Sequence, residues 1–198
     1  MKLSKGIIAI IVLVVIGLGI FMWGKSAYNG LVGKQEAVSS QWAQVQNAYQ
    51  RRSDLIPNLV ATVKGYATHE QSTLTAVVEA RAKATQMQVN ANDLTEENIQ
   101  KYQQAQGQLS TALGRLMMIT ENYPDLKANQ NFMALQDELS GTENRIATER
   151  NKFNVRVQEY NTSIRMFPRN IFASLFGFDK KGYFEADQNA QTAPTVEF

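Results

Sequence analysis

An uncharged stretch near the N-terminus limits what this chain can fold into more than any other feature. No charged residue occurs between Lys5 and Lys25, and residues 6–24 read GIIAIIVLVVIGLGIFMWG. As a helix this stretch spans roughly 28 Å at about 1.5 Å per residue, which matches a hydrocarbon layer of about 30 Å. Apolar side chains cover every face of such a helix, as in a membrane span. The stretch therefore predicts a transmembrane helix at 6–24, preceded by a short flank at 1–5.

The alternative is a cleaved signal peptide, whose apolar part is usually shorter, at about 7–15 residues. We favour a retained span, which makes the lipid bilayer the first partner of this chain. Aromatic rings with a polar edge prefer the headgroup level, so we expect Trp23 and Tyr28 at the membrane interface. The side chains expected to lie within the membrane are those of Ile7, Ile11, Val15, Leu18 and Phe21.

The charges that flank the span predict its orientation. Lys2 and Lys5 precede it, whereas Lys25 and Lys34 follow it and Glu36 offsets one of them. The positive-inside rule therefore favours, by a margin of about one charge, a cytoplasmic N-terminus and a domain outside the cytoplasm.

The rest of the chain has the composition of a protein with long helices. Its few prolines and glycines leave long stretches without helix-breaking residues. The formal net charge is only +2 and the charges are interspersed, so a nucleic-acid partner is not expected. The chain has no Cys and one histidine, His69, which lacks the companions of a usual metal site. We expect no metal and no cofactor.

Two heptad repeats predict the fold. The first runs through Val38, Trp42, Val45, Tyr49, Arg52, Ile56, Leu59, Val63 and Tyr66. The second runs through Phe132, Leu135, Leu139, Thr142, Ile146, Glu149, Phe153, Val157, Tyr160, Ile164 and Phe167. Spacings that alternate between four and three residues are typical of helices packed at a shallow angle. The sequence thus predicts an all-α protein, with an antiparallel bundle of three to four long helices and coiled-coil-like packing at 25–167.

Two shorter helices are expected between the repeats. The first covers about 70–89, with Leu74, Val77, Val78, Arg81 and Ala84 on one side. The second begins with a capping box formed by Asp93 and Glu96, and its apolar face holds Ile99, Tyr102, Ala105, Leu109, Leu113 and Leu116. A loop at 122–131 then leads into the second heptad repeat.

Two residues of the first repeat break its regularity. Pro57 removes a backbone donor and crowds the preceding turn, so a kink or irregularity is expected near Ser53–Ile56. Arg52 occupies a core position, where an unpaired charge is costly. If the two long helices are antiparallel, Arg52 lies near Glu143 and Glu149 and forms a structural ion pair with one of them. This pair either sets the register of the bundle or belongs to a site for a ligand or partner.

The C-terminal tail is rich in aromatic residues at 168–184 and polar, with expected disorder, at 185–198. Ile171, Phe172, Leu175 and Phe176 form an apolar stripe on a short helix that Gly177 closes. The tail can cap the bundle, contact a partner or lie in the membrane interface. Because the last long helix descends toward the membrane, we favour the interface, with Phe172, Phe176 and Phe178 as contacts.

Four segments resemble the LemA family of bacterial membrane proteins. They are 51–66, with Arg51, Arg52, Asp54, Pro57 and Asn58; 123–135, with Pro124; 142–161, with Asn144, Asn154 and Asn161; and 167–178. The resemblance implies a bacterial inner or plasma membrane protein with one N-terminal span and a helical bundle. It supplies no catalytic residues.

No phosphate-binding loop and no nucleophile elbow occur in the sequence, so an enzyme is not expected. The favoured function is a membrane-anchored, non-enzymatic scaffold or adaptor for unidentified protein partners or a second copy of the chain. A membrane-associated sensor or small-ligand-binding bundle is the alternative.

Overall fold

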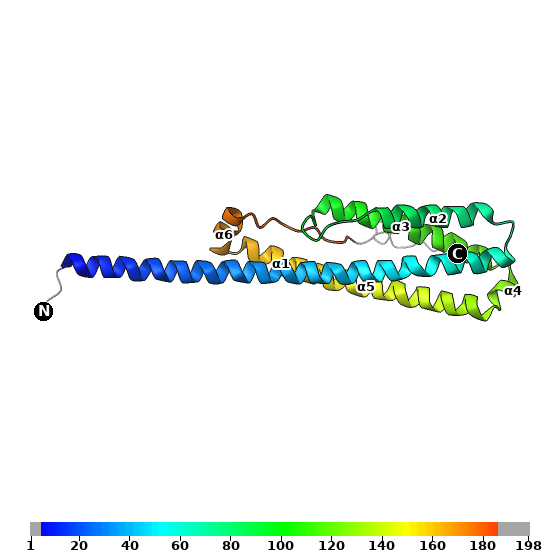
Figure 1. Ribbon diagram of the computed structural model, residues 1–198, viewed down its shortest axis with the longest axis horizontal. Helices are drawn as coiled ribbons and strands as arrows, with labels where there is room; N and C mark the ends of the chain where they lie inside the picture. Colours follow the sequence, from blue (N-terminus) through cyan, green and yellow to red (C-terminus); the bar gives the residue numbers. More distant parts are fainter. Residues whose placement is uncertain (1–4, 186–198) are drawn as a thin grey trace, which may run out of the picture.

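Helices are the only regular secondary structure within residues 5–185, the range that the computed structural model describes (Figure 1). The helices are α1 (Lys5–Tyr66), α2 (Gln71–Gln86), α3 (Glu96–Thr120), α4 (Pro124–Lys127), α5 (Gln130–Arg165) and α6 (Arg169–Phe176). The all-α prediction is confirmed. The expected disorder at the C-terminus falls almost wholly on 186–198 and the flank almost wholly on 1–4, which lie outside the described residues.

The long helices α1 and α5 form an antiparallel pair along most of the molecule (Figure 1). Both heptad repeats lie in this contact, and every core position from Val38 to Val63 is buried. The exceptions are at the ends: Tyr66 is exposed, Leu135 is half-buried, and Phe167 is exposed because α5 ends at Arg165. The packing of α1 against α5, along the faces predicted from the spacing, is therefore the main contact of the fold.

The shorter helices α2 and α3 form a hairpin that packs on α1 (Figure 1). Three details differ from the sequence-based predictions. Val78 is 50% exposed, and Gln106, rather than Ala105, is buried on α3. The capping residue of α3 is Thr95, whose hydroxyl accepts from the Asn98 backbone N–H, so the predicted Asp93 cap is wrong.

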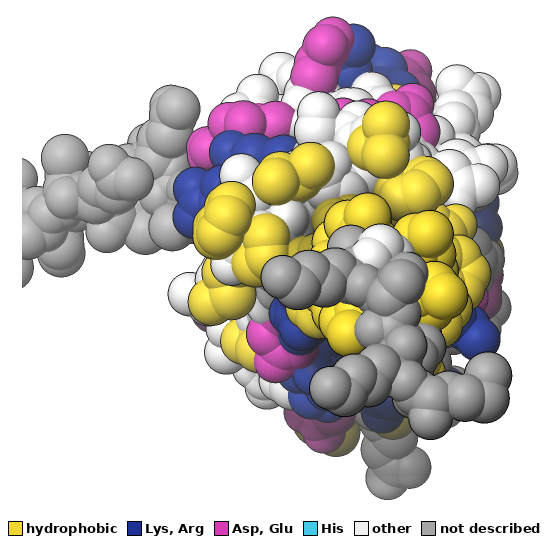
Figure 2. All heavy atoms as spheres, turned by 90° about the vertical axis from the view of Figure 1, so that its left-hand side faces the viewer, with side chains coloured by type: hydrophobic (Ala, Val, Ile, Leu, Met, Phe, Trp, Pro, Cys, Tyr) yellow, Lys and Arg dark blue, Asp and Glu magenta, His cyan; other side chains and the backbone are white. Residues whose placement is uncertain are grey.

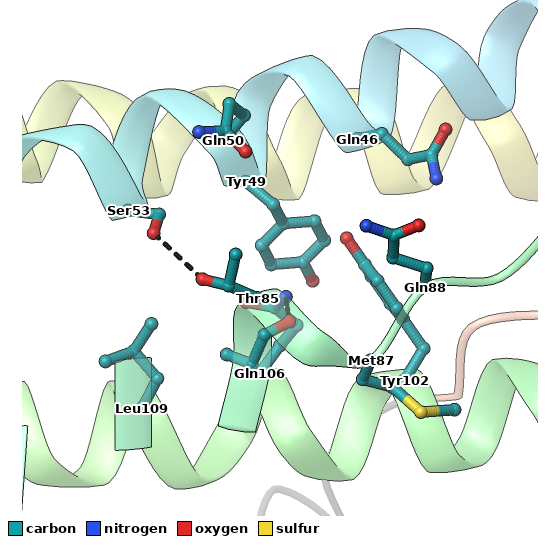
Figure 3. Close-up of a pocket in the computed structure, with 11 residues that line it drawn as sticks. Gln46, Tyr49, Gln50, Ser53, Thr85, Met87, Gln88, Tyr102, Gln106 and Leu109 are labelled. Carbon is teal, nitrogen blue, oxygen red and sulfur yellow. Dashed lines mark hydrogen bonds between the residues drawn. The ribbon is translucent and has the colours of Figure 1, made fainter. Parts of the chain in front are cut away.

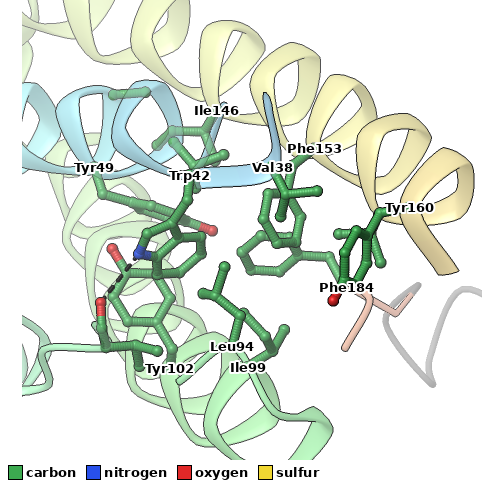
Figure 4. Packing of buried hydrophobic residues seen from close by; sticks show 14 of the residues in the cluster. Val38, Trp42, Tyr49, Leu94, Ile99, Tyr102, Ile146, Phe153, Tyr160 and Phe184 are labelled. Atoms are coloured by element: carbon green, nitrogen blue, oxygen red, sulfur yellow. Dashed lines mark hydrogen bonds between the residues drawn. The ribbon is translucent and has the colours of Figure 1, made fainter. Parts of the chain in front are cut away.

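An aromatic cluster fills the half of the bundle nearer the N-terminal end of α1 (Figure 4). The Trp42 ring centroid lies 5.1 Å from that of Tyr102, 5.4 Å from Phe153 and 5.9 Å from Phe184. The Trp42 indole N–H also donates to the Val89 carbonyl oxygen at 3.0 Å. An indole that is buried on both faces and hydrogen-bonded at its edge joins α1, α3, α5 and the C-terminal segment.

The N-terminal part of α1 differs from the rest of the helix in its surroundings. Its large apolar side chains from Ile7 to Met22 are 49–69% exposed, whereas Ala27 and Leu31 begin the buried part, at 4% and 1%. This helix is long and apolar enough to cross a membrane. It continues without interruption into the bundle, over roughly 93 Å for its 62 residues at about 1.5 Å per residue.

Candidate functional site

A buried arginine links three helices at the middle of the bundle. Arg52 is 1% exposed, and its Nη1 lies 2.8 Å from the Glu143 carboxylate and 2.8 Å from the Ser110 hydroxyl. Its Nη2 donates to the Gln106 side-chain oxygen at 2.7 Å. The structure thus brings together Arg52 of α1 and Glu143 of α5, the first of the two partners considered from the sequence. A buried charge held by several acceptors fixes how the helices meet.

Glu149 takes no part in this contact, so the alternative pairing of Arg52 with Glu149 is wrong. The Glu149 carboxylate accepts from Gln41 Nε2 at 2.7 Å and from Lys152 Nζ at 3.0 Å. The hydrogen bond from Gln41, followed by that from Lys152, lowers the pKa of Glu149. Glu149 therefore remains ionised and helps to join α1 to α5, six residues, or about one and two-thirds turns, beyond Glu143 on α5.

Two tyrosines complete the surroundings of Arg52. The Arg52 guanidinium carbon lies 5.0 Å from the Tyr49 ring centroid, and the Tyr49 and Tyr102 rings meet edge to face at 5.3 Å. Burial raises the pKa of Tyr49 and also that of Tyr102. Both phenols are therefore neutral at ordinary pH and do not balance the charge of Arg52. Among the described residues, Glu143 is the one carboxylate that forms a salt bridge with the Arg52 guanidinium.

Two cavities flank this arginine. One, of about 330 Å³, lies among α1, α3 and α5 and is lined by Arg52, Gln103, Gly107, Glu143 and Arg150, among others. The second, also of about 330 Å³, lies between α1 and the α2–α3 hairpin (Figure 3). Its lining is mostly uncharged and polar, with side chains that include Gln46, Tyr49, Gln50, Gln88, Tyr102 and Gln106. Both can hold a small polar molecule or water.

Pro57 lies inside α1, which continues past it to Tyr66, so the predicted irregularity does not end the helix. Because proline has no N–H, the Ser53 carbonyl lacks its normal helical donor. Arg81 of α2 supplies the replacement, since its Nε donates to the Ser53 oxygen at 2.8 Å. The proline thereby becomes a docking point for the α2–α3 hairpin. Sequence reasoning placed Arg81 on the packed face but did not identify this role.

The remaining family-motif residues are exposed or at helix ends. Arg51 forms a salt bridge with Glu138, and Asp54 accepts from the Gln50 side-chain amide at 2.7 Å. Asn58 and Asn144 point to solvent. Pro124 is the first residue of α4, where a missing N–H costs nothing.

The segment after α6 runs back along the bundle, and we call residues 178–185 the C-terminal strap (Figure 1). Two asparagines of α5 each hold one strap residue through both backbone groups. Asn161 pairs with the N–H and carbonyl of Lys181 at 2.9 and 2.8 Å, and Asn154 pairs in the same way with Phe184 at 2.9 and 2.8 Å. The seven residues from Asn154 to Asn161 rise about 10.5 Å along α5, which is close to the length of the three extended residues from Lys181 to Phe184. The spacing of the two asparagines therefore matches the spacing of the two strap residues that they hold.

The strap also closes the bundle on the side of α3. Gln103 pairs with both backbone groups of Glu185, and the Gly182 N–H donates to the Leu94 carbonyl at 2.8 Å. Phe184 is 5% exposed between Trp42 and Phe153. Half of the predicted aromatic tail is therefore a part of the core. The available signal was the seven-residue spacing of Asn154 and Asn161, each next to a core aromatic residue.

The other half of the tail lies against α1 where its apolar part ends. The Phe172 and Trp23 ring centroids are 5.2 Å apart, and Tyr28 contacts Phe176 at 5.1 Å and Phe178 at 5.5 Å. Phe178 is half-buried against the bundle core, so it is less available as an interface contact than the sequence suggested. α6 ends at Gly177 in a left-handed conformation with φ 72°, as its sequence predicts.

No group of three or more His, Cys, Asp or Glu that could hold a metal ion occurs within residues 5–185. His69 is exposed in the turn between α1 and α2.

The geometry defines a helical bundle built on one long helix. The N-terminal part of this helix is apolar and exposed, and its middle carries a buried arginine that pairs with a partly exposed glutamate. The chain belongs to the LemA family, whose family model matches residues 41–198. The match begins at Gln41, so the apolar part of α1 lies outside it.

Curated relatives support this assignment. The chain is 26% identical to Magnetosome protein MamQ 1 of Paramagnetospirillum magneticum over 176 residues, which covers 80% of this chain and 64% of the relative. It is 26% identical to Magnetosome protein MamQ of Magnetospirillum gryphiswaldense over 175 residues, or 79% and 64% of the two chains. It is 24% identical to Protein LemA of Metamycoplasma hominis over 160 residues, or 81% and 69%. The chain thus spans less than two thirds of the length of the MamQ relatives.

Proposed function

We propose that this protein is a membrane-anchored scaffold or adaptor whose helical rod presents its faces to other proteins. The observation that carries the proposal is the continuity of α1. One helix includes both the exposed apolar stretch at 6–24 and the buried heptad positions from Val38 to Val63. A bundle joined to its span without a flexible linker is held at a defined height and angle, which suits a scaffold.

The surface of the rod fits transient contacts better than an obligate interface. From Tyr66 to Val155 the large apolar side chains that remain exposed are scattered: Tyr66, Val78, Met118, Met133 and Val155. Single exposed hydrophobic residues of this kind are normal on a soluble surface, whereas obligate interfaces expose contiguous apolar patches. The rod beyond Tyr28 is about 57 Å long at about 1.5 Å per residue, long enough for several partners.

Anchoring is tested by placing charges in the apolar stretch of the full chain. Val12→Arg together with Ile16→Arg puts two cations at the middle of the span, where each costs about 2.5–3.5 kcal/mol on the insertion scale. We expect the native chain and the control Val12→Leu/Ile16→Leu to remain in membranes after carbonate extraction, and the arginine variant to be released. Release of the native chain would overturn the proposal.

The membrane we propose is the bacterial inner or plasma membrane, with the N-terminus in the cytoplasm and the bundle outside it. Asn90 is exposed between α2 and α3. In a chain without native Cys, Asn90→Cys should react in intact cells with a membrane-impermeant thiol reagent that reaches the cell membrane from outside. Labelling only after lysis would place the bundle in the cytoplasm.

Scaffolding is tested by photo-crosslinking in cells from exposed positions on the rod, such as Gln108 of α3 and Asn144 of α5. The proposal predicts adducts with a small set of proteins, or with a second copy of the chain. Adducts with lipid alone at both positions would contradict it.

The cavity beside Arg52 supports a second candidate, a bundle that binds a small polar ligand. Gly107 lines this cavity, and a Cβ added there would meet no atom within 4 Å. If a ligand is bound, native mass spectrometry of the full chain should detect a co-purifying mass that Gly107→Trp removes while helical content is unchanged. A single ligand-free mass for the native chain would count against this candidate.

A further inference from the structure

A contiguous apolar surface lies at the end of the bundle where α1 leaves it. The chain turns after α5 at Met166–Pro168 and enters α6, and five large apolar side chains of this unit stay exposed. Their exposed fractions are 54% for Met166, 81% for Phe167, 57% for Ile171, 73% for Leu175 and 52% for Phe176. We call these five residues the α6 patch. A soluble surface rarely gathers so many large apolar groups within eleven residues.

The inner side of α6 fixes the position of this patch. Phe172 packs against Trp23 and lies so close to Gly24 that a Cβ there would be 2.9 Å from its ring. Phe176 packs against Tyr28, about a turn and a half further along α1. The α6 patch therefore lies beside residues 23–28, directly where the membrane-length apolar stretch ends. Figure 2, which views the molecule from this end, shows hydrophobic side chains gathered beside the apolar helix.

The charged residues within the two segments beside the patch are basic, and the nearest acids, Glu159 and Asp179, lie just outside these segments. Residues 20–33 of α1 and residues 160–178 of α5 and α6 contain Lys25, Arg165 and Arg169 and no Asp or Glu. All three basic side chains are exposed. Exposed cations beside an apolar surface are the pattern of segments that bind anionic lipid headgroups at the membrane interface.

We propose that the α6 patch inserts into the headgroup region of the same bilayer that α1 crosses, with anionic phospholipids next to Lys25, Arg165 and Arg169. This inference rests on the proposed anchoring by α1. A cap on the bundle core does not explain the patch, because none of its members belongs to a core cluster and Phe167 is the most exposed large apolar residue of the described chain. The protein then has two membrane contacts, a span and an interfacial helix, which together fix the tilt of the rod.

The test uses single spin labels on the full chain, which has no native Cys. Leu175→Cys reports on the patch, Leu18→Cys on the span, and Val155→Cys on the exposed surface of the bundle; all three side chains are at least 47% exposed, so labelling should not disturb packing. Each variant is reconstituted in vesicles of 70% phosphatidylcholine and 30% phosphatidylglycerol. Collision rates with oxygen, which enters lipid, and with a nickel chelate, which stays in water, give the depth of each label.

We expect the Leu18 label to lie deep in the bilayer, the Leu175 label at interfacial depth and the Val155 label in water. In pure phosphatidylcholine, or when Arg165→Gln and Arg169→Gln are added, the Leu175 label should shift toward the Val155 value while the Leu18 label does not move.

If the Leu175 label matches the Val155 label while the Leu18 label is in lipid, the interfacial contact is wrong and the anchor stands. Strong spin–spin coupling between Leu175 labels of two chains would show that a second copy covers the patch, which also overturns the inference. If the Leu18 label itself is in water, the anchor fails and the inference fails with it.

Discussion

The side chain of Arg81 replaces the backbone donor that Pro57 denies to the Ser53 carbonyl, with a 2.8 Å hydrogen bond from Nε to the Ser53 oxygen. A proline in a long helix usually bends or ends it. In this protein the freed acceptor is used to fasten a second helix, and α1 continues to Tyr66. The hairpin of α2 and α3 is thereby placed at one height on the rod.

This hydrogen bond predicts a coupling between Arg81 and Pro57. Arg81→Met leaves the partly buried Ser53 carbonyl without a donor and should lower the free energy of unfolding by about 1–2 kcal/mol. In the background of Pro57→Ala the backbone N–H is restored, so the same change should cost less. A double-mutant cycle by denaturant unfolding in detergent gives the coupling. Equal costs in both backgrounds would show that Arg81 does not serve the proline.

The Arg52–Glu143 pair predicts an unusual order of stabilities. Glu143→Gln leaves a buried guanidinium without its carboxylate, and we expect a loss of about 1–3 kcal/mol, below the usual 3–5 because Glu143 is 42% exposed. Adding Arg52→Met to this variant removes the buried charge and should recover part of the loss. Thermal unfolding of the two variants compares them directly. A double variant less stable than Glu143→Gln alone would contradict the interpretation.

The lowered pKa of Glu149 predicts a loss of stability in acid. Its folded-state pKa is below the ordinary value of 4.5, so its contribution is complete above that value and is lost as the pH falls through the folded pKa. Between pH 7 and pH 3 the native chain should therefore lose more unfolding free energy than Glu149→Gln. The control is Glu159→Gln, an exposed glutamate of the same helix. Parallel pH profiles for the native chain and Glu149→Gln would rule this out.

The raised pKa of Tyr160 predicts a loss of stability in alkali. Burial raises its pKa to about 12, and its hydroxyl has no hydrogen-bond partner among the described residues. Its stabilising effect is complete below the ordinary value of 10.0 and is lost as the pH rises toward about 12. Tyr160→Phe should be neutral or stabilising near pH 7 and should lose less stability than the native chain by pH 11. A loss of more than about 1 kcal/mol at pH 7 would indicate an unseen partner for the hydroxyl.

The docking of the C-terminal strap predicts that alanine substitutions at two glycines have opposite effects on stability. A Cβ on Gly182 would lie 2.6 Å from the Glu96 Cα and 2.9 Å from the Thr95 carbonyl oxygen, and neither backbone atom can easily move. Gly182→Ala should therefore cost about 1–3 kcal/mol and expose the strap to limited proteolysis. Gly141→Ala, at an open helical site on α5, should instead stabilise the chain by about 0.5–1 kcal/mol. Similar effects of the two changes would mean that the strap is not docked as described.

Much of the fold follows from spacing alone. Every heptad position from Val38 to Val63 is buried, because a helix with apolar residues at alternating four- and three-residue intervals has only one face to bury. The same reasoning narrowed the partner of Arg52 to two glutamates. The heptad spacing could not choose between Glu143 and Glu149, which lie one to two turns apart on α5. The choice depends on where the hairpin of α2 and α3 packs.

Other features depend on contacts that sequence periodicity does not encode. Val78 was expected in the core, but the packing of α2 on both α1 and α3 turns it to solvent. The strap has no periodicity of its own and is held through its backbone by Asn154, Asn161 and Gln103. Side-chain amides that bind a backbone leave no pattern in the segment they hold, so this part of the core was not predicted.

The most direct test of the whole account is the length and rigidity of α1 in a bilayer. Labels at Leu18→Cys and Ala61→Cys are separated by 43 residues, or about 65 Å in one straight helix at about 1.5 Å per residue. Pulsed electron–electron distance measurements on the full chain in lipid nanodiscs should give one narrow distribution near that value. A broad distribution at shorter distances would show that the span and the rod are joined flexibly, and would contradict a scaffold held at a fixed height.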